Sequence, residues 1–90
     1  MYLGLLVISQ QTNAKISSKH GISFDQVKDA IQWPARPRAK WENHPKHGRR
    51  VVAVGATEGK PVFCTLKPLP EYDENADTWE ITTALWLVRR

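Results

Sequence analysis

Residues 19–24, with the sequence Lys-His-Gly-Ile-Ser-Phe, constrain the fold most strongly, because they combine a helix stop with a helix start. Gly21 suits the left-handed position just past a helix end. Ser23 is a favourable N-cap residue, and Gln26 three positions later completes a capping-box pattern. We therefore predict one helix that ends near His20 and a second helix that begins directly after the cap.

Hydrophobic spacing divides the remaining chain into strands and helices. The expected elements are a strand over 3–8, a helix over 13–20, a helix that begins at 24 and is ended by Pro34, and strands over 38–42, 49–57, 60–66 and 78–84. The apolar pattern of residues 3–8 suggests a strand that is either central or well covered, whereas 38–42, which follows a proline, suits a sheet edge. This order predicts a single α+β domain over 1–90, with an N-terminal strand, two short helices and then a three- to four-stranded antiparallel sheet that has the helices on one face.

Charge is unevenly distributed, although the net charge is only +4. Residues 36–50 contain six basic side chains, two histidines and one acid, whereas residues 71–80 contain five acids and no lysine or arginine. A basic block of this kind is a candidate phosphate-binding face. The alternative is that both segments are ordinary solvated surface.

Metal and thiol chemistry are not indicated. Cys64 is the only cysteine and lies among apolar residues, so we expect a core side chain in a reducing cytoplasm. The three histidines and this cysteine are widely scattered, and we expect no metal and no cofactor. No apolar run reaches the length of a membrane span, and we expect a cytoplasmic protein without membrane contact.

The remaining chemistry is cleavage of RNA, in which the substrate 2′-hydroxyl is the nucleophile and no cofactor is required. Such a site needs a proton acceptor, a proton donor and cations that stabilise the phosphorane. The available groups are His20, His44, His47, Lys19, Arg38, Arg49 and Arg50. Trp41, inside the basic block, could either stack on a base or pack at a sheet edge.

Several segments resemble BrnT-type toxins, which are small ribonucleases of bacterial type II toxin–antitoxin modules within the RelE/ParE-like superfamily. Residues 19–25 are similar to the family signature KHG(V/I)SFEE. Residues 47–55 resemble the arginine-bearing strand, 59–63 the following hairpin strand, and 79–84 the strand that leads into I(S/T)AR.

The resemblance implies a cytosolic endoribonuclease that inhibits translation and growth and is neutralised by an antitoxin. It also implies a compact α+β fold whose antiparallel sheet faces RNA. Lys19 and His20 take the place of the family's basic pair and Arg49 or Arg50 that of its strand arginine, so these four are the catalytic candidates. The candidates for RNA binding are Arg36, Arg38, Lys40, Trp41, His44, Lys46 and His47.

One departure favours a second interpretation. Leu85 stands where the family has an arginine, and an uncharged side chain cannot stabilise a phosphorane. The alternative is therefore a catalytically silent relative, such as a phage-encoded copy, that acts by binding protein or nucleic acid. The apolar tail 85–88 also suggests a protein partner or self-association, and it could extend the last strand or begin a short helix.

Overall fold

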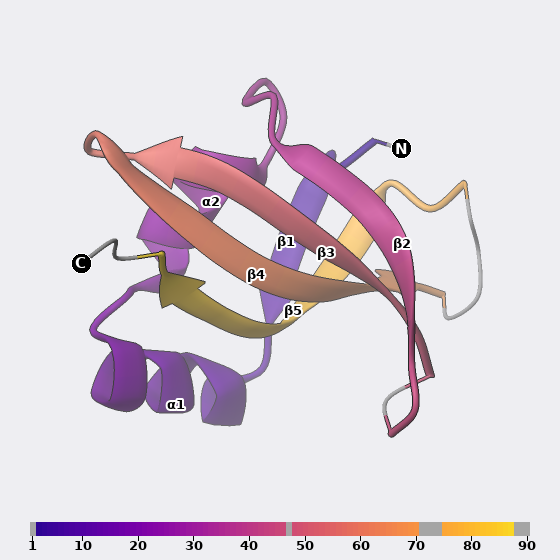
Figure 1. Cartoon of the computed structure of the whole chain (residues 1–90), viewed down its shortest axis with the longest axis horizontal. Coiled ribbons are helices and arrows are strands. Elements are labelled where there is room, and N and C mark those ends of the chain that lie inside the picture. Colours follow the sequence, from indigo (N-terminus) through magenta and orange to yellow (C-terminus); the bar gives the residue numbers. More distant parts are fainter. Residues whose placement is uncertain (1, 47, 71–74, 88–90) are drawn as a thin grey trace.

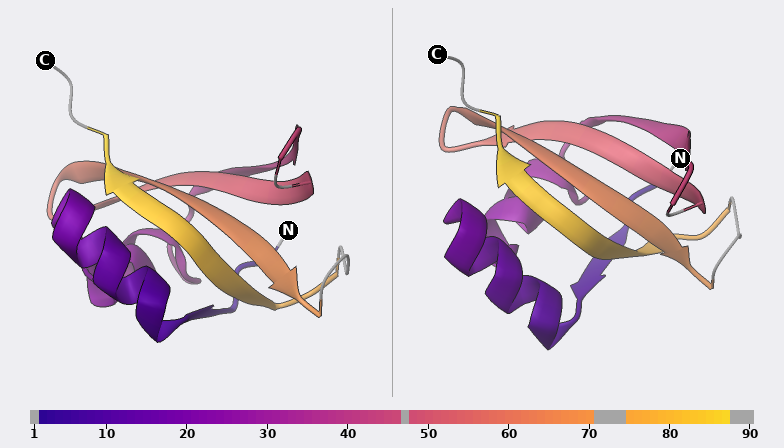
Figure 2. Two further views of the ribbon diagram at one scale, coloured as in Figure 1. Left: turned by 90° about the horizontal axis from the view of Figure 1, so that it is seen from below. Right: turned by 60° about the horizontal axis from the view of Figure 1, so that its bottom comes forward.

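Five strands form one sheet, and two helices lie on the same side of it (Figures 1 and 2). The computed structural model describes residues 2–46, 48–70 and 75–87. The elements are β1 (Leu5–Ile8), α1 (Gln10–His20), α2 (Phe24–Ile31), β2 (Arg38–His44), β3 (Gly48–Thr57), β4 (Lys60–Leu69) and β5 (Thr78–Trp86). His47, residues 71–74 of the acidic segment and Val88 of the apolar tail lie outside the described residues.

The strand order is β1-β5-β4-β3-β2, and β2 to β5 are successive antiparallel neighbours. β1 pairs in parallel with β5, which is possible because two helices separate β1 from the rest of the sheet along the chain. The expected α+β class is confirmed. The sheet has five strands in mixed orientation, because the N-terminal strand joins the antiparallel strands β2–β5 as a parallel edge, a pairing that the sequence did not predict.

The corner between the helices is formed as its sequence predicts. Gly21 adopts φ +62°, and its N–H donates to the Ser17 carbonyl at 3.1 Å. Ser23 and Gln26 form both bonds of a capping box. The start of α1 was misjudged: its N-cap is Ser9, whose hydroxyl accepts from the Thr12 N–H, and this exposed helix has too weak an apolar pattern to reveal the extra turn.

The core lies between the helices and the sheet. It includes Ile16, Ile22, Val27 and Ile31 from the helical segment, and Val51, Leu66, Trp79 and Ile81 from the sheet. The expectation of a central first strand was wrong, since β1 is an edge strand: Leu6 is 2% exposed and faces the core, whereas Leu5 is 51% exposed. Only one face of β1 is therefore covered.

Gly55 is the point at which α2 comes closest to β3. A Cβ atom on this residue would overlap the Ala30 carbonyl oxygen and lie 2.9 Å from Ile31 Cδ1. The absence of a side chain at this position therefore allows the helix to pack directly on the sheet.

We expect Gly55→Ala to lower the free energy of unfolding by about 3 kcal/mol, because the methyl group meets backbone that cannot move independently. Gly21→Ala is the control, since its added Cβ meets nothing within 4 Å and only the left-handed conformation is penalised, by about 1–2 kcal/mol. Urea unfolding of the two variants measures the difference. An equal or smaller loss for Gly55→Ala would contradict the close approach.

Candidate nucleic-acid interface on the open sheet face

The face of the sheet opposite the helices is uncovered by any described element (Figure 2). Ala39 and Trp41 of β2 pack against the core cluster. Because side chains alternate along a strand, Arg38, Lys40, Glu42 and His44 point to the open face. These four residues, all from the basic block 36–50, therefore lie on one surface of the sheet.

Arg50 joins this surface from β3. It is the cross-strand partner of Glu42, and its Nε and Nη2 atoms lie 3.0 and 2.8 Å from Glu42 Oε1. A guanidinium has five N–H bonds, so this pairing orients Arg50 and leaves donors for a phosphate. Sequence reasoning missed Glu42, although the symmetric register of a hairpin around residues 45–47 would have placed it opposite Arg50.

His44 lies two positions beyond Glu42 on the same face of β2. Its Nδ1 atom accepts a hydrogen bond from the Lys46 N–H at 3.1 Å. The neutral ring therefore carries its proton on Nε2. The end of the sheet at the β2–β3 turn thus brings together an imidazole, a carboxylate and an arginine, and Lys46 is exposed in that turn.

The other half of the open face is apolar. Val54, Phe63 and Leu85 are successive cross-strand partners on β3, β4 and β5, and Arg38 completes the row on β2. All three apolar side chains are partly buried. Leu85 therefore belongs to an apolar row across the sheet.

The helix corner lies at the other end of the sheet from Arg50. Trp86 Nε1 donates to the Gly21 carbonyl at 3.2 Å. Trp86 on β5 is the cross-strand partner of Val62 on β4, which is in turn the partner of Gly55 on β3, so the corner lies level with Gly55. Gly55 and Arg50 are five residue steps apart along β3, about 16 Å at the usual rise. The helix corner also reaches the β3–β4 turn, where Gln26 Nε2 donates to Glu58 at 2.7 Å. The structure therefore does not gather the four catalytic candidates, since Lys19 and His20 precede this corner and Arg49 and Arg50 lie next to the β2–β3 turn.

Arg49 points to the opposite face from Arg50. Its Cζ atom lies 4.3 Å from the centroid of the Trp41 ring, and that ring lies 5.6 Å from Trp79 between centroids. Of the two interpretations of Trp41, packing at a sheet edge agrees with this arrangement. Arg36 is also away from the open face, beside a hollow that precedes β2.

Two comparisons add no identification: no known family model matches this chain, and no curated protein matches it. Within the described residues, no group of three or more histidine, cysteine or acidic side chains could hold a metal ion. No helix of that part of the chain is long and apolar enough to cross a membrane.

Cys64 is a core residue, as its apolar sequence context suggested. It is 0% exposed, and burial raises the pKa of its thiol to about 12. At pH 8 only about one molecule in ten thousand would carry the reactive thiolate.

We therefore expect the folded protein to resist iodoacetamide at pH 8, whereas the protein in concentrated urea reacts like free cysteine. Mass spectrometry of the alkylated chain over time measures both rates. Equal rates in the two conditions would show that this part of β4 opens to solvent.

Proposed function

We propose that the protein is a BrnT/RelE-like toxin that inhibits translation and growth by acting on RNA at the open face of its sheet. The observation that carries the proposal is the one-sided placement of the helices (Figure 2), which leaves the face of the sheet that carries Arg38 and Lys40 uncovered by any described element. Arg38 and Lys40 are exposed, and neither pairs with an acid among the described residues. Both are therefore available to RNA phosphates.

The chemistry at the β2–β3 end suits scission of an RNA strand. Solvent accepts the proton of the 2′-hydroxyl, whose oxygen then attacks the phosphorus. His44 Nδ1 already accepts from the Lys46 N–H, so its Nε2–H can donate a hydrogen bond to a non-bridging phosphate oxygen. Arg50, held in place by Glu42, stabilises the charge that develops on the phosphorane. The bond to the 5′-oxygen breaks, and solvent supplies the proton to this leaving group. The catalytic role proposed from the sequence for His20 passes in this arrangement to His44.

A second candidate is binding without cleavage. It is favoured by Leu85, which lies beside Phe63 where the family resemblance calls for an arginine. An apolar row in the middle of the face provides contact area for a base or a protein side chain and no charge for a transition state. The two candidates differ only in whether the bound RNA is cut.

We expect Arg38→Ala combined with Lys40→Ala to weaken binding of single-stranded RNA and to reduce the slope of log affinity against log salt by about 1.4. The matched control is Lys15→Ala with Lys19→Ala, which removes the same charge from exposed positions on α1. Fluorescence anisotropy of a labelled oligonucleotide at several salt concentrations measures both slopes. Equal slopes for the two double variants would place the RNA elsewhere.

Induced expression of the parent chain in bacteria should arrest growth, and His44→Gln and Arg50→Ala should each relieve the arrest. His20→Ala, at the far end of the sheet, should remain toxic. RNA extracted from the arrested cells shows whether cleavage accompanies the effect. Toxicity that survives both open-face substitutions, without cleaved RNA, would support the binding-only candidate, and a harmless parent would refute the toxin proposal.

A further inference from the structure

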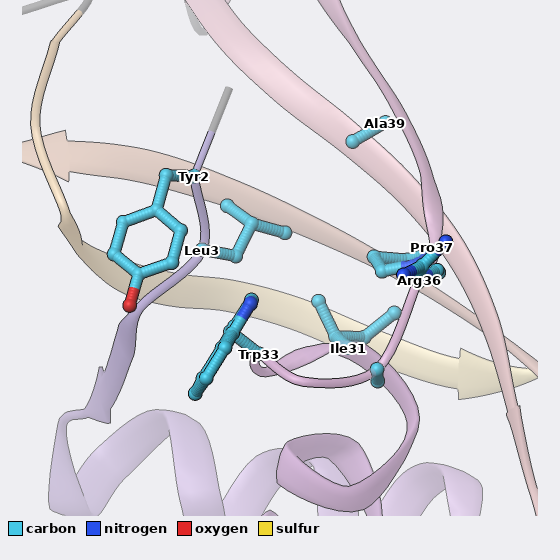
Figure 3. A pocket seen from close by; sticks show the side chains of 8 residues that line it. Tyr2, Leu3, Ile31, Trp33, Arg36, Pro37 and Ala39 are labelled. Atoms are coloured by element: carbon cyan, nitrogen blue, oxygen red, sulfur yellow. The ribbon is translucent and has the colours of Figure 1, made fainter.

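A hollow of about 230 Å³ lies beside the start of β2, on the helix side of the sheet (Figure 3). Its walls include Tyr2, Leu3, Ile31, Trp33, Pro37 and Ala39. This volume is large enough for one leucine or phenylalanine side chain. The hollow is separate from the open face described above, because Ala39 points away from that face.

Two large side chains at this hollow remain in solvent. Trp33 is 61% exposed and Tyr2 is 50% exposed, and they are two of the four large apolar residues exposed in the described part of the chain. Their rings meet edge to face, with 6.2 Å between centroids. A backbone hydrogen bond of 2.8 Å from the Trp33 N–H to the Leu3 carbonyl fixes this arrangement. Paired exposed aromatic residues beside a hollow are typical of a protein-binding site.

The backbone of β2 provides a second recognition element. β2 is the last strand of the sheet, pairing with β3 on one side and with no described residue on the other. An extended segment that added to this edge would continue the hydrogen-bonded ladder. Its residue opposite Ala39 would point to the same face as Ala39, and therefore toward the hollow.

Charge determines what kind of segment fits. Arg36, Arg38 and Lys40 are exposed at this edge, and none of them pairs with an acid among the described residues. On an added strand, the residues on either side of the one above the hollow would point to the open face, where Arg38 and Lys40 lie. Acidic side chains at those positions would complement both charges.

We propose that the free edge of β2 and the adjacent hollow bind an extended acidic segment of a partner protein, with the pattern acid–large apolar–acid. The apolar side chain occupies the hollow, and the flanking carboxylates contact Arg38 and Lys40. A regulatory role of this binding rests on the proposed function, because the bound segment would cover Arg38 and Lys40, the two cations that we propose contact RNA. Binding of the segment itself is independent of toxicity.

Selection of a displayed library of seven-residue peptides, the length of β2, against the purified protein tests the proposal. Enriched peptides should carry the acid–apolar–acid pattern. Amide NMR should place the bound peptide along residues 38–44 and shift the indole N–H of Trp33. Failure to enrich peptides, enrichment of basic ones, or a footprint on β1 or the helices would each overturn the proposal.

Two variants locate the site. Trp33→Ser, and separately Arg38→Glu with Lys40→Glu, should weaken an enriched peptide about tenfold or more. Leu5→Ser is the matched control, since it removes another apolar side chain that is more than half exposed, from the opposite edge of the sheet. An effect of Leu5→Ser as large as that of Trp33→Ser would overturn the assignment.

Competition separates this proposal from the proposed function. A peptide that binds at β2 and displaces labelled RNA supports both. A peptide that binds at β2 while the protein shows no affinity for RNA supports the docking site and contradicts the proposed action on RNA. RNA binding that persists with the peptide seated at β2 would overturn the regulatory part.

Discussion

Trp79 connects both edges of the sheet to its centre, and the rest of the structure depends on that connection. Its side chain is 0% exposed, its Nε1 atom donates to the Tyr2 carbonyl at 3.0 Å, and its ring packs on Trp41 of β2. Its backbone lies beside Leu6 of β1 in the parallel pair. One buried indole therefore holds the N-terminal segment, β1, β5 and β2 on the helix side, and the polar side chains of β2 are left on the other side.

Local signals predicted much of the fold. Gly21 and Ser23 indicate the helix corner by their own conformational preferences, and the turn at Glu58-Gly59 indicates the β3–β4 hairpin. The parallel pairing of β1 with β5 could not be predicted in this way, since it joins segments about 70 residues apart and leaves no local pattern. The exposure of Leu5 follows from that pairing, so an apolar run was misinterpreted as a central strand.

The sequence identified most residues of the candidate site, but it did not predict which of them lie close together. Strand alternation assigns Arg38, Lys40 and His44 to one face, and this much follows from the sequence once β2 is accepted. The distance between His20 and Arg50 depends on which end of the sheet meets the helix corner, and Trp86 decides that through its bond to Gly21. A motif that predicts the corner between two helices therefore does not by itself predict which residues form the candidate site.

β2 has two roles that depend on the parity of its residues: Ala39 and Trp41 face the core side, and Arg38 and Lys40 face the open side. A shift of one residue would exchange the two sets, placing two cations against Trp79 and two apolar groups in solvent. Single-residue insertions or deletions between Arg38 and Trp41 should therefore be excluded during evolution even where substitutions are tolerated. Relatives of this chain should therefore keep the alternation of core-facing and open-face residues along β2, even after most of the side chains have changed.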